Sequence, residues 1–338
     1  MSAGEAMQNV LVVGRIHEAG LAVLRSRPGL NVVSLEDPGA AIPMQEVARA
    51  DAILIRYGTL SEEAIEQAPR LRVVSRHGVG CDNLPVAALS ARGIPVMVAG
   101  SVSAVSVAEQ TMAMLLAAAK KITVYDSAVR SGNWAVRDGI SAVEISGKTL
   151  LLLGFGRIGR EVAKRAHAFG MTVLACDPGV GFEEMAAIGV EKVDDWRAAL
   201  PRVDVLSLHV PLGPATHDLV DAGVLGRLKN TAIIINTARG GLIDEAALHH
   251  ALTTRLVDGA AALDTFRQEP VRADHPFCRL PNVVLSPHSA ALTKEGSMRL
   301  GVVSAQNVLA GLDGTMDPAL IFNRAALTDL ADRRRQGS

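Results

Sequence analysis

Residues 147–177 read GKTLLLLGFGRIGREVAKRAHAFGMTVLACD, in which an apolar run meets three glycines and a helical pattern leads to a second apolar run. The first run, Thr149–Leu153, is typical of a parallel strand buried on both faces. Gly154 permits a sharp turn, Gly156 lets the backbone approach a pyrophosphate, and Gly159 lets a helix pack close to the sheet. Such a turn can also be a packing feature, so its context decides. The stretch predicts strand, turn, helix and strand, with phosphates bound by N–H groups at the helix N-terminus.

Asp177 supplies that context. It ends the second apolar run, about 21 residues beyond Gly156, near the spacing of roughly 20 expected for a carboxylate that binds the adenine ribose 2′-hydroxyl. A carboxylate there would repel the 2′-phosphate of NADP, and the following PGVG contains no arginine to bind that phosphate. The position therefore favours NAD as the cofactor.

Length and composition indicate a well-buried protein of two domains. The chain has 338 residues, of which 49% are hydrophobic and 20% charged, and one core usually stops growing before this size. A net charge of −1 and 3% aromatic residues provide neither a basic surface nor stacking groups for a nucleic acid. We expect no nucleic-acid partner, and we interpret ADRRR near the C-terminus as a solvated tail.

No segment is typical of secretion or of a membrane span. The N-terminus lacks a basic region followed by an apolar core, and the apolar stretch 105–122 includes Glu109 and two lysines, as in a buried helix. The three cysteines, Cys81, Cys176 and Cys278, fit neither a disulfide framework nor a zinc site. We therefore expect no metal, no membrane association and a cytoplasmic location.

The chain alternates short apolar runs with amphipathic stretches, which predicts βαβ units and parallel sheets. The first series lacks a glycine triplet, so its sheet should bind something other than a nucleotide. An Ala-rich helical pattern at 103–121 and another beyond Ala290 predict two crossings between domains. We expect an α/β protein with two doubly wound domains: a discontinuous, flavodoxin-like substrate domain, 1–102 plus 292–338, and a Rossmann NAD domain of about six strands, 103–291.

Three polar residues follow predicted strands, where open parallel sheets bind ligands. Arg239 follows AIIINT and could hold a carboxylate with its two-pronged guanidinium, or could be a surface arginine. Glu269 lies shortly after GAAALD, where an exposed loop carboxylate is the alternative. His288 follows NVVLS and Pro287; a lone histidine is usually solvated, but this position suits a proton donor to a bound carbonyl.

Together, these stretches resemble the D-2-hydroxyacid dehydrogenase family of NAD-dependent oxidoreductases, which includes phosphoglycerate dehydrogenases and hydroxypyruvate or glyoxylate reductases. The resemblance covers nearly the whole chain, including RHGVGCDN and SVAE. Two departures are Ser103, where many members have asparagine, and DTF in place of the commoner DVF. Six ordered motifs carry the resemblance: GFGRIG, Asp177, HVPLGPATHDLV, NTARGGLIDEAAL, ALDTFRQEP and SPHSA.

The resemblance implies hydride transfer between the nicotinamide C4 and the substrate C2, with a closing cleft and a triad of Arg239, Glu269 and His288. His288 would be the acid in reduction and the base in oxidation. Glu269 would favour the imidazolium form of His288, and Arg239 would anchor the substrate carboxylate. The implied cofactor contacts are Gly154, Gly156, Arg157, Ile158, Gly159, Asp177, His209, Pro211, Thr216, Thr237 and Asp264, of which His209 and Thr216 could equally be structural.

The resemblance also implies a loop for the substrate carboxylate: the N–H groups of Gly78, Val79 and Gly80, with Asn83 as support. Other cations near the expected substrate site are Arg56, Arg76 and Arg137. If two or more face it, a second anionic group on the substrate is expected; pairing with local carboxylates is the alternative. The sequence therefore predicts a small anionic 2-hydroxy or 2-keto acid and leaves open which one.

Competing hypotheses differ in class. One is a non-catalytic NAD-sensing scaffold similar to the corepressors of this fold, which the complete triad disfavours. Another is formate dehydrogenase, which pairs its histidine with glutamine and so disagrees with Glu269. The chain ends about 50 residues after His288, so we expect no C-terminal regulatory domain and no feedback control by serine. The resemblance also implies a homodimer formed through the NAD domain, with Trp134 reaching the partner or, more simply, packing in the monomer core.

Overall fold

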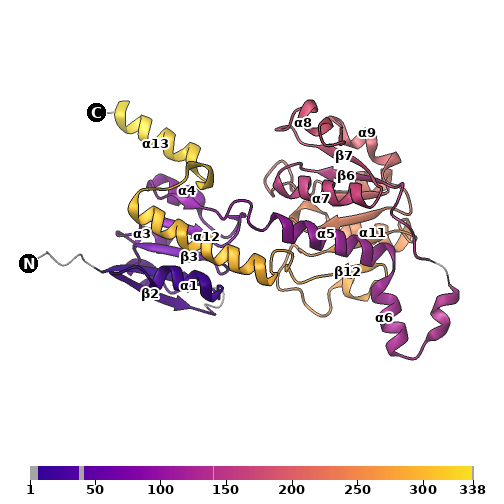
Figure 1. Ribbon diagram of the computed structural model, residues 1–338, viewed down its shortest axis with the longest axis horizontal. Coiled ribbons are helices and arrows are strands. Elements are labelled where there is room, and N and C mark those ends of the chain that lie inside the picture. The colour runs from indigo at the N-terminus through magenta and orange to yellow at the C-terminus, as the bar shows by residue number, and fades with distance from the viewer. Residues whose placement is uncertain (1–6, 38–41, 140, 337–338) are drawn as a thin grey trace, which may run out of the picture. The chain divides into compact units, whose positions relative to one another are not determined.

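The computed structural model describes residues 7–37, 42–139 and 141–336, which form two compact units (Figure 1). Unit 1 comprises Met1–Ser103 and Thr293–Ser338, and unit 2 comprises Ala104–Leu292. Each boundary lies one residue beyond the one expected from the sequence. Among the described residues, no helix is both long and apolar enough to cross a membrane.

Unit 1 contains a sheet whose described strands are all parallel, in the order β2-β1-β3-β4-β5. This is the flavodoxin-like order, so the predicted fold class is confirmed for this unit. Its central strand β3 is fully buried because both faces of the sheet are covered. The strands are β1 (Gln8–Val13), β2 (Leu30–Leu35), β3 (Ala52–Ile55), β4 (Val73–Arg76) and β5 (Val96–Met97).

Helix α12 (Lys294–Asp313) returns the chain to the first sheet. A Cβ on Gly311 would lie 2.5 Å from Val73, so the helix lies directly on β4. The Ser75 hydroxyl donates to the Ser304 carbonyl at 2.9 Å, across 229 residues of sequence. Unit 1 is thus built from two separate stretches of chain. Its other helices are α1 (Glu18–Arg25), α2 (Met44–Arg49), α3 (Glu62–Glu66), α4 (Val86–Ala91), η5 (Pro318–Leu320) and α13 (Arg324–Gln336).

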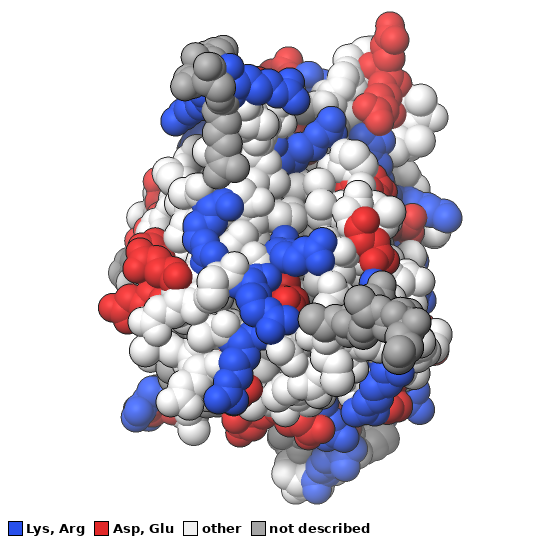
Figure 2. All heavy atoms as spheres, turned by 90° about the vertical axis from the view of Figure 1, so that its left-hand side faces the viewer, with Lys and Arg blue, Asp and Glu red and all other residues white. Residues whose placement is uncertain are grey.

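The C-terminal ADRRR is part of α13 and is not a tail. The side chains of residues 331–333 are exposed, so their solvation was predicted but their helical structure was not. The face drawn in Figure 2 shows basic and acidic side chains interspersed among uncharged ones.

Unit 2 contains a second sheet of parallel strands, seven among the described residues, in the order β12-β11-β10-β9-β6-β7-β8. This is the predicted Rossmann order with one strand more than expected. The additional strand is β8, which has only two residues and lies at the edge. The strands are β6 (Thr149–Leu153), β7 (Thr172–Cys176), β8 (Glu191–Lys192), β9 (Val205–Leu208), β10 (Ile233–Asn236), β11 (Ala260–Leu263) and β12 (Val283–Leu285).

The burial of β6 on both faces of the sheet explains its four consecutive leucines. Leu151 and Leu153 belong to the apolar cluster on one face of the sheet, and Leu150 and Leu152 to the cluster on the other. Helix α5 (Ala104–Ala119) packs with α7 on the second of these faces (Figure 1). The other helices of unit 2 are α6 (Ile122–Arg130), η1 (Trp134–Asp138), α7 (Arg157–Ala168), α8 (Phe182–Ala186), α9 (Trp196–Ala199), η2 (Leu200–Arg202), α10 (Ala222–Arg227), η3 (Gly240–Leu242), α11 (Glu245–Thr254) and η4 (Pro276–Arg279).

Candidate active site

The glycine turn between β6 and α7 has a different reason for each glycine. Gly154 has φ +96° and lies so near the His209 carbonyl that a Cβ would come within 2.6 Å of its oxygen. A Cβ on Gly159 would overlap the Gly154 carbonyl oxygen. At Gly156, the N-cap of α7, a Cβ would meet nothing within 4 Å. The turn is therefore packed on two sides and open at the helix N-terminus, where Arg157 and Ile158 begin the helix, as a pyrophosphate site requires.

Asp177 follows β7 and reaches this turn. Its carboxylate oxygens accept hydrogen bonds from the N–H groups of Phe155 and Gly179, each at 2.8 Å. The carboxylate is thus fixed beside the residue between the first two glycines of the turn. This is where a group that binds the adenine ribose must lie.

The segment after β9 forms a self-contained loop. The Thr216 hydroxyl donates to the Pro211 carbonyl at 2.6 Å and accepts from the Gly213 N–H at 2.8 Å, so its role within this loop is structural. Burial lowers the pKa of His209 to about 4, and its Nε2 lies 2.9 Å from the Ser207 hydroxyl. At neutral pH His209 is therefore an uncharged ring.

Two of the predicted cofactor residues are engaged inside the protein. The Thr237 hydroxyl lies 2.9 Å from that of Thr111 on α5, and both are buried. Asp264 is fully buried, and its carboxylate accepts from the N–H groups of Ser289 and Ala290 at 2.9 and 3.0 Å. Asp264 therefore holds the segment that follows His288, and its contact with a nicotinamide stays a prediction.

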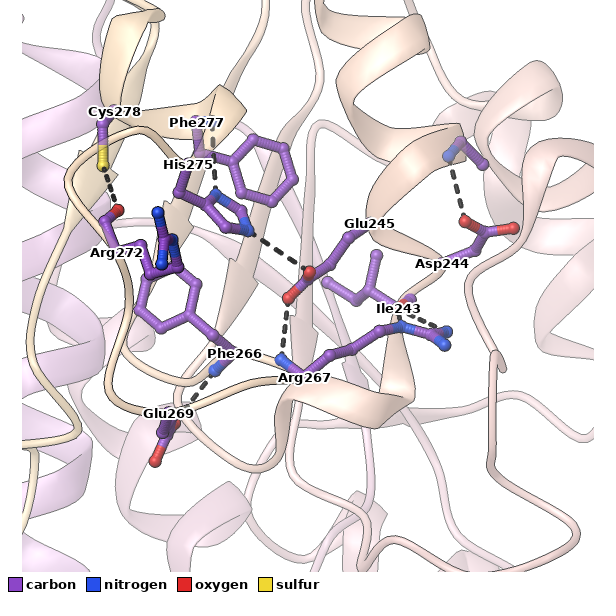
Figure 3. A network of polar contacts seen from close by, with 11 residues as sticks. Ile243, Asp244, Glu245, Phe266, Arg267, Glu269, Arg272, His275, Phe277 and Cys278 are labelled. Carbon is purple, nitrogen blue, oxygen red and sulfur yellow. Dashed lines mark hydrogen bonds and ion pairs between the residues drawn. The ribbon is translucent and has the colours of Figure 1, made fainter.

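The structure brings His288 and Glu269 together: the His288 Nδ1 lies 2.8 Å from a carboxylate oxygen of Glu269. The other carboxylate oxygen accepts from the Phe266 N–H at 3.0 Å (Figure 3). The His288 backbone has φ +51°, and its N–H donates to the Asp264 carbonyl at 2.7 Å. The backbone and the side chain of His288 are thus both held by hydrogen bonds. Nε2 is the other ring nitrogen, the one that can exchange a proton with a substrate.

Glu269 stays ionised despite partial burial. Burial by itself raises its pKa, but hydrogen bonds from His288 and the Phe266 N–H, together with the charges of His288 and Arg239, hold the pKa of Glu269 below its usual value. The structure thus joins His288 and Glu269 directly, and the participation of Arg239 in a triad stays a prediction.

The loop that carries Arg239 is organised by Asn236 at the end of β10. The buried Asn236 side chain donates to the Arg239 carbonyl at 2.7 Å and accepts from the Ala238 N–H at 3.0 Å. The Arg239 guanidinium donates to the Ala238 carbonyl at 2.7 Å. Asparagine side chains often hydrogen-bond to nearby backbone groups and so stabilise turns. The asparagine at the end of this strand was therefore a sequence signal for the organising role of Asn236, which we did not predict.

In unit 1, the predicted carboxylate loop follows β4. Gly78 has φ +148°, and a side chain there would meet nothing within 4 Å. The Gly78 N–H donates to the Arg76 carbonyl at 2.8 Å, and the prediction that this group binds an anion stays a prediction. Val79, which is exposed, and Gly80 lie in this loop. The Asn83 amide supports the loop by donating to the Gly58 carbonyl at 2.8 Å.

The predicted substrate cations bond to backbone carbonyls. Arg76 donates to the carbonyls of Gly80 and Ile55, at 2.8 and 3.2 Å, and so braces the loop. Arg56 donates to the Arg15 carbonyl at 2.5 Å. Burial, with the charges of Arg56 and Arg76, lowers the pKa of His77 to about 4. The two arginines therefore lie close to one neutral histidine.

No metal site is found within the described part of the chain, where no three His, Cys, Asp or Glu side chains cluster suitably. Arg137, expected near the substrate, stacks on Trp134 in η1, with its guanidinium 5.9 Å from the ring centre. Cys81, Cys176 and Cys278 are all free thiols.

Comparison with known proteins identifies the family. The family described as "D-isomer specific 2-hydroxyacid dehydrogenase, NAD binding domain" matches residues 112–290, within unit 2. D-3-phosphoglycerate dehydrogenase of Methanocaldococcus jannaschii is 38% identical over 92% of this chain and 58% of its own length. Glyoxylate reductase of Korarchaeum cryptofilum is 35% identical over 92% of this chain and 95% of its own.

A solved structure agrees: D-lactate dehydrogenase from Aquifex aeolicus, complexed with NAD and lactic acid, has a TM-score of 0.81 and 29% identity, over 91% of this chain and 96% of its own. The chain spans only 58% of the length of the phosphoglycerate dehydrogenase relative. The residues at the glycine turn and Asp177 fit NAD, which is the cofactor of the matched domain. The chain therefore belongs to the D-isomer specific 2-hydroxyacid dehydrogenase family.

Proposed function

We propose that this protein is an NAD-dependent oxidoreductase that interconverts a small D-2-hydroxy acid and the corresponding 2-keto acid. The observation that carries the proposal is the pair formed by His288 Nδ1 and Glu269 at 2.8 Å, near Arg239 and in the unit that contains the glycine turn. Bound NAD supplies or accepts the hydride at the substrate C2. The protein supplies proton transfer, anchoring and orientation.

His288 is proposed to move the proton. With Nδ1 directed at Glu269, Nε2 donates a proton to the substrate C2 oxygen in reduction and accepts it in oxidation. The ionised Glu269 stabilises the protonated ring and fixes its orientation. This assigns acid and base work to one side chain and support to the other.

Arg239 in unit 2 is proposed to bind the substrate carboxylate, and the loop after β4 in unit 1 is proposed to be an anion-binding loop. A guanidinium can hold a carboxylate with two parallel hydrogen bonds, and the N–H groups of Val79 and Gly80 can donate hydrogen bonds to the same kind of anion. A substrate phosphate or sulfonate would need further cations; Arg56 and Arg76 lie in unit 1 near His77 but are bonded to carbonyls. We therefore propose a small 2-keto acid with one required carboxylate.

Consumption of NADH with a panel of hydroxypyruvate, glyoxylate, phosphohydroxypyruvate, pyruvate and sulfopyruvate tests the proposal. At least one acid should support turnover, and His288→Ala should lose at least about 100-fold in kcat because its proton-transfer group is gone. His17→Ala, which removes a histidine of unit 1 at the start of α1, should leave turnover unchanged. Turnover of none of the acids, or full activity in His288→Ala, would contradict the proposal.

Trp134 and α6 support a homodimer formed through unit 2. Trp134, Ile122 and Val129 expose 65%, 54% and 53% of their surfaces. The alternative of a Trp134 packed in the monomer core is therefore wrong. Exposed apolar side chains grouped on one segment are typical of a subunit contact, and Figure 1 shows α6 and η1 extending from the body of unit 2. We propose that this segment binds a second copy of the chain, and that the three free thiols reflect a cytoplasmic location.

A further inference from the structure

The turn that carries Glu269 is fixed by a second set of contacts, centred on Glu245 at the start of α11 (Figure 3). Glu245 Oε1 accepts from the Arg267 N–H at 2.8 Å. The neighbouring residue, Phe266, donates its own N–H to Glu269. The hydrogen bond to Glu245 and the hydrogen bond that orients the Glu269 carboxylate therefore come from the N–H groups of adjacent residues.

Three further contacts hold the same stretch of backbone. A Cβ on Gly240 would overlap the Phe266 carbonyl, so the backbone after Arg239 lies directly against it. The Arg267 guanidinium donates to the Ile243 carbonyl at 3.1 and 3.2 Å and pairs with Asp218. Gly240, Ile243 and Glu245 all follow Arg239 in sequence. These contacts therefore join the loop of Arg239 to the loop of Glu269.

Glu245 is suited to this role by its place on α11. It is the first residue of the helix, where free N–H groups favour a negative charge, and Asp244 already caps that helix by accepting from the Ala247 N–H at 3.0 Å. The Glu245 carboxylate is therefore not needed as a cap and can reach Arg267. Its side chain is 19% exposed, and its other oxygen lies 3.5 Å from Nε2 of His275.

We propose that Glu245 is a positioning residue: by holding the Arg267 N–H, it fixes the turn that directs Glu269 at His288. This rests on the proposed function for the activity measurements below, while the geometry it concerns exists without substrate. The role depends on the reach of the Glu245 side chain and on its oxygen as a hydrogen-bond acceptor, and not on its charge.

Two conservative variants separate reach from charge. Glu245→Asp keeps the charge at the helix N-terminus but withdraws the oxygen by one methylene, whereas Glu245→Gln keeps an oxygen in reach and removes the charge. We expect Glu245→Asp to lose roughly 10- to 100-fold in kcat/KM, since misplacement by about 1 Å costs up to about 100-fold. Glu245→Gln should stay within about threefold of the wild type. Asp195→Ala, which removes the side-chain cap of α9 in the same unit, is the control and should leave kcat/KM unchanged.

The pH dependence identifies positioning as opposed to general destabilisation. A loosened Glu269 stabilises the imidazolium less, so in Glu245→Asp the alkaline fall of kcat/KM for reduction should move to lower pH, with no such shift in Asp195→Ala. NMR titration of the His288 imidazole should show the same displacement without substrate or turnover. If the wild type reduces none of the acids, the proposed function fails and this titration still decides the role of Glu245. An unchanged His288 titration in Glu245→Asp, or a Glu245→Gln as impaired as Glu245→Asp, would overturn the inference.

Discussion

Thr265 illustrates a cost at the scale of a single atom. It is 2% exposed, and its hydroxyl has no hydrogen-bond partner among the described residues. A buried polar group without a partner costs roughly 1–3 kcal/mol. The threonine is the departure from DVF noted in the sequence, and the structure shows that its hydroxyl forms no bond that would compensate.

Thr265→Val should therefore raise the free energy of unfolding by about 1 kcal/mol, because it removes the hydroxyl and keeps the shape. Urea denaturation measures the change. The matched control is Thr111→Val: its hydroxyl donates to the Val107 carbonyl at 2.8 Å and meets Thr237 at 2.9 Å, so this variant should lose about 1 kcal/mol. Equal effects of the two substitutions would contradict the explanation.

Glu269→Gln tests the ion pair of the triad. Because the pKa of Glu269 is held below its usual value, the carboxylate stays charged at neutral pH, and its support of His288 is lost only as the pH falls through that lowered pKa. The variant removes this support at every pH. We expect roughly 100-fold lower kcat/KM and an alkaline fall at lower pH in profiles of the reduction reaction. Asp274→Asn, which breaks an exposed ion pair with Arg272, should leave the profile in place; a profile unchanged in Glu269→Gln would exclude the assigned role.

For single residues, the sequence was a better guide to which residues belong to the candidate site than to the hydrogen bonds that they form. Arg239, Glu269 and His288 were predicted because each follows a strand. The sequence did not predict the hydrogen bonds of Gly78, Arg76 and the other predicted contacts, since hydrogen bonds to backbone carbonyls depend on the path of the chain. No pattern of residue types encodes that path.

At the scale of elements, the strand–turn–helix around the three glycines offers a direct comparison. Gly156→Ala should fold normally, since its Cβ would meet nothing within 4 Å, yet it should weaken NADH binding at least about tenfold by filling the space for the pyrophosphate. Gly159→Ala should instead destabilise the protein by several kcal/mol, because its Cβ would overlap the Gly154 carbonyl. Thermal unfolding and an NADH titration of both variants distinguish these effects. Loss of folding in Gly156→Ala would refute the distinction.

The sequence missed helix α13 and strand β8, which is short and lies at an edge. Strand β8 pairs with β7 through only Glu191 and Lys192, so neither alternation nor an apolar run marks it. Most helices and the inner strands were predicted because burial on one face imposes a period on the sequence and burial on both faces gives an unbroken apolar run. A two-residue edge strand is defined by its neighbour alone.

For the whole molecule, the exposed apolar segment of α6 and η1 gives the test of assembly. Trp134→Asp should convert a dimer to a monomer, because a buried, unpaired charge at the contact costs several kcal/mol. Light scattering coupled to size exclusion measures the mass. Phe182→Asp alters an aromatic residue that is equally exposed, at 66% on α8, and should not change the mass. A wild-type monomer, or a dimeric Trp134→Asp, would rule out this segment as the contact.

The return of α12 to β4 also has a consequence for synthesis on the ribosome. Ser75 and Ser304 are 229 residues apart, which at about 5–20 residues per second means a delay of roughly 10–45 s. Throughout that interval the side chains of Val10, Val12, Leu54 and Val73 have only α1 on their face of the sheet and lack the apolar contacts that α12 later supplies. Unit 2 is contiguous and its last strand emerges before α12. The N-terminal sheet is therefore the part of the nascent chain that most needs a chaperone, although it is made first.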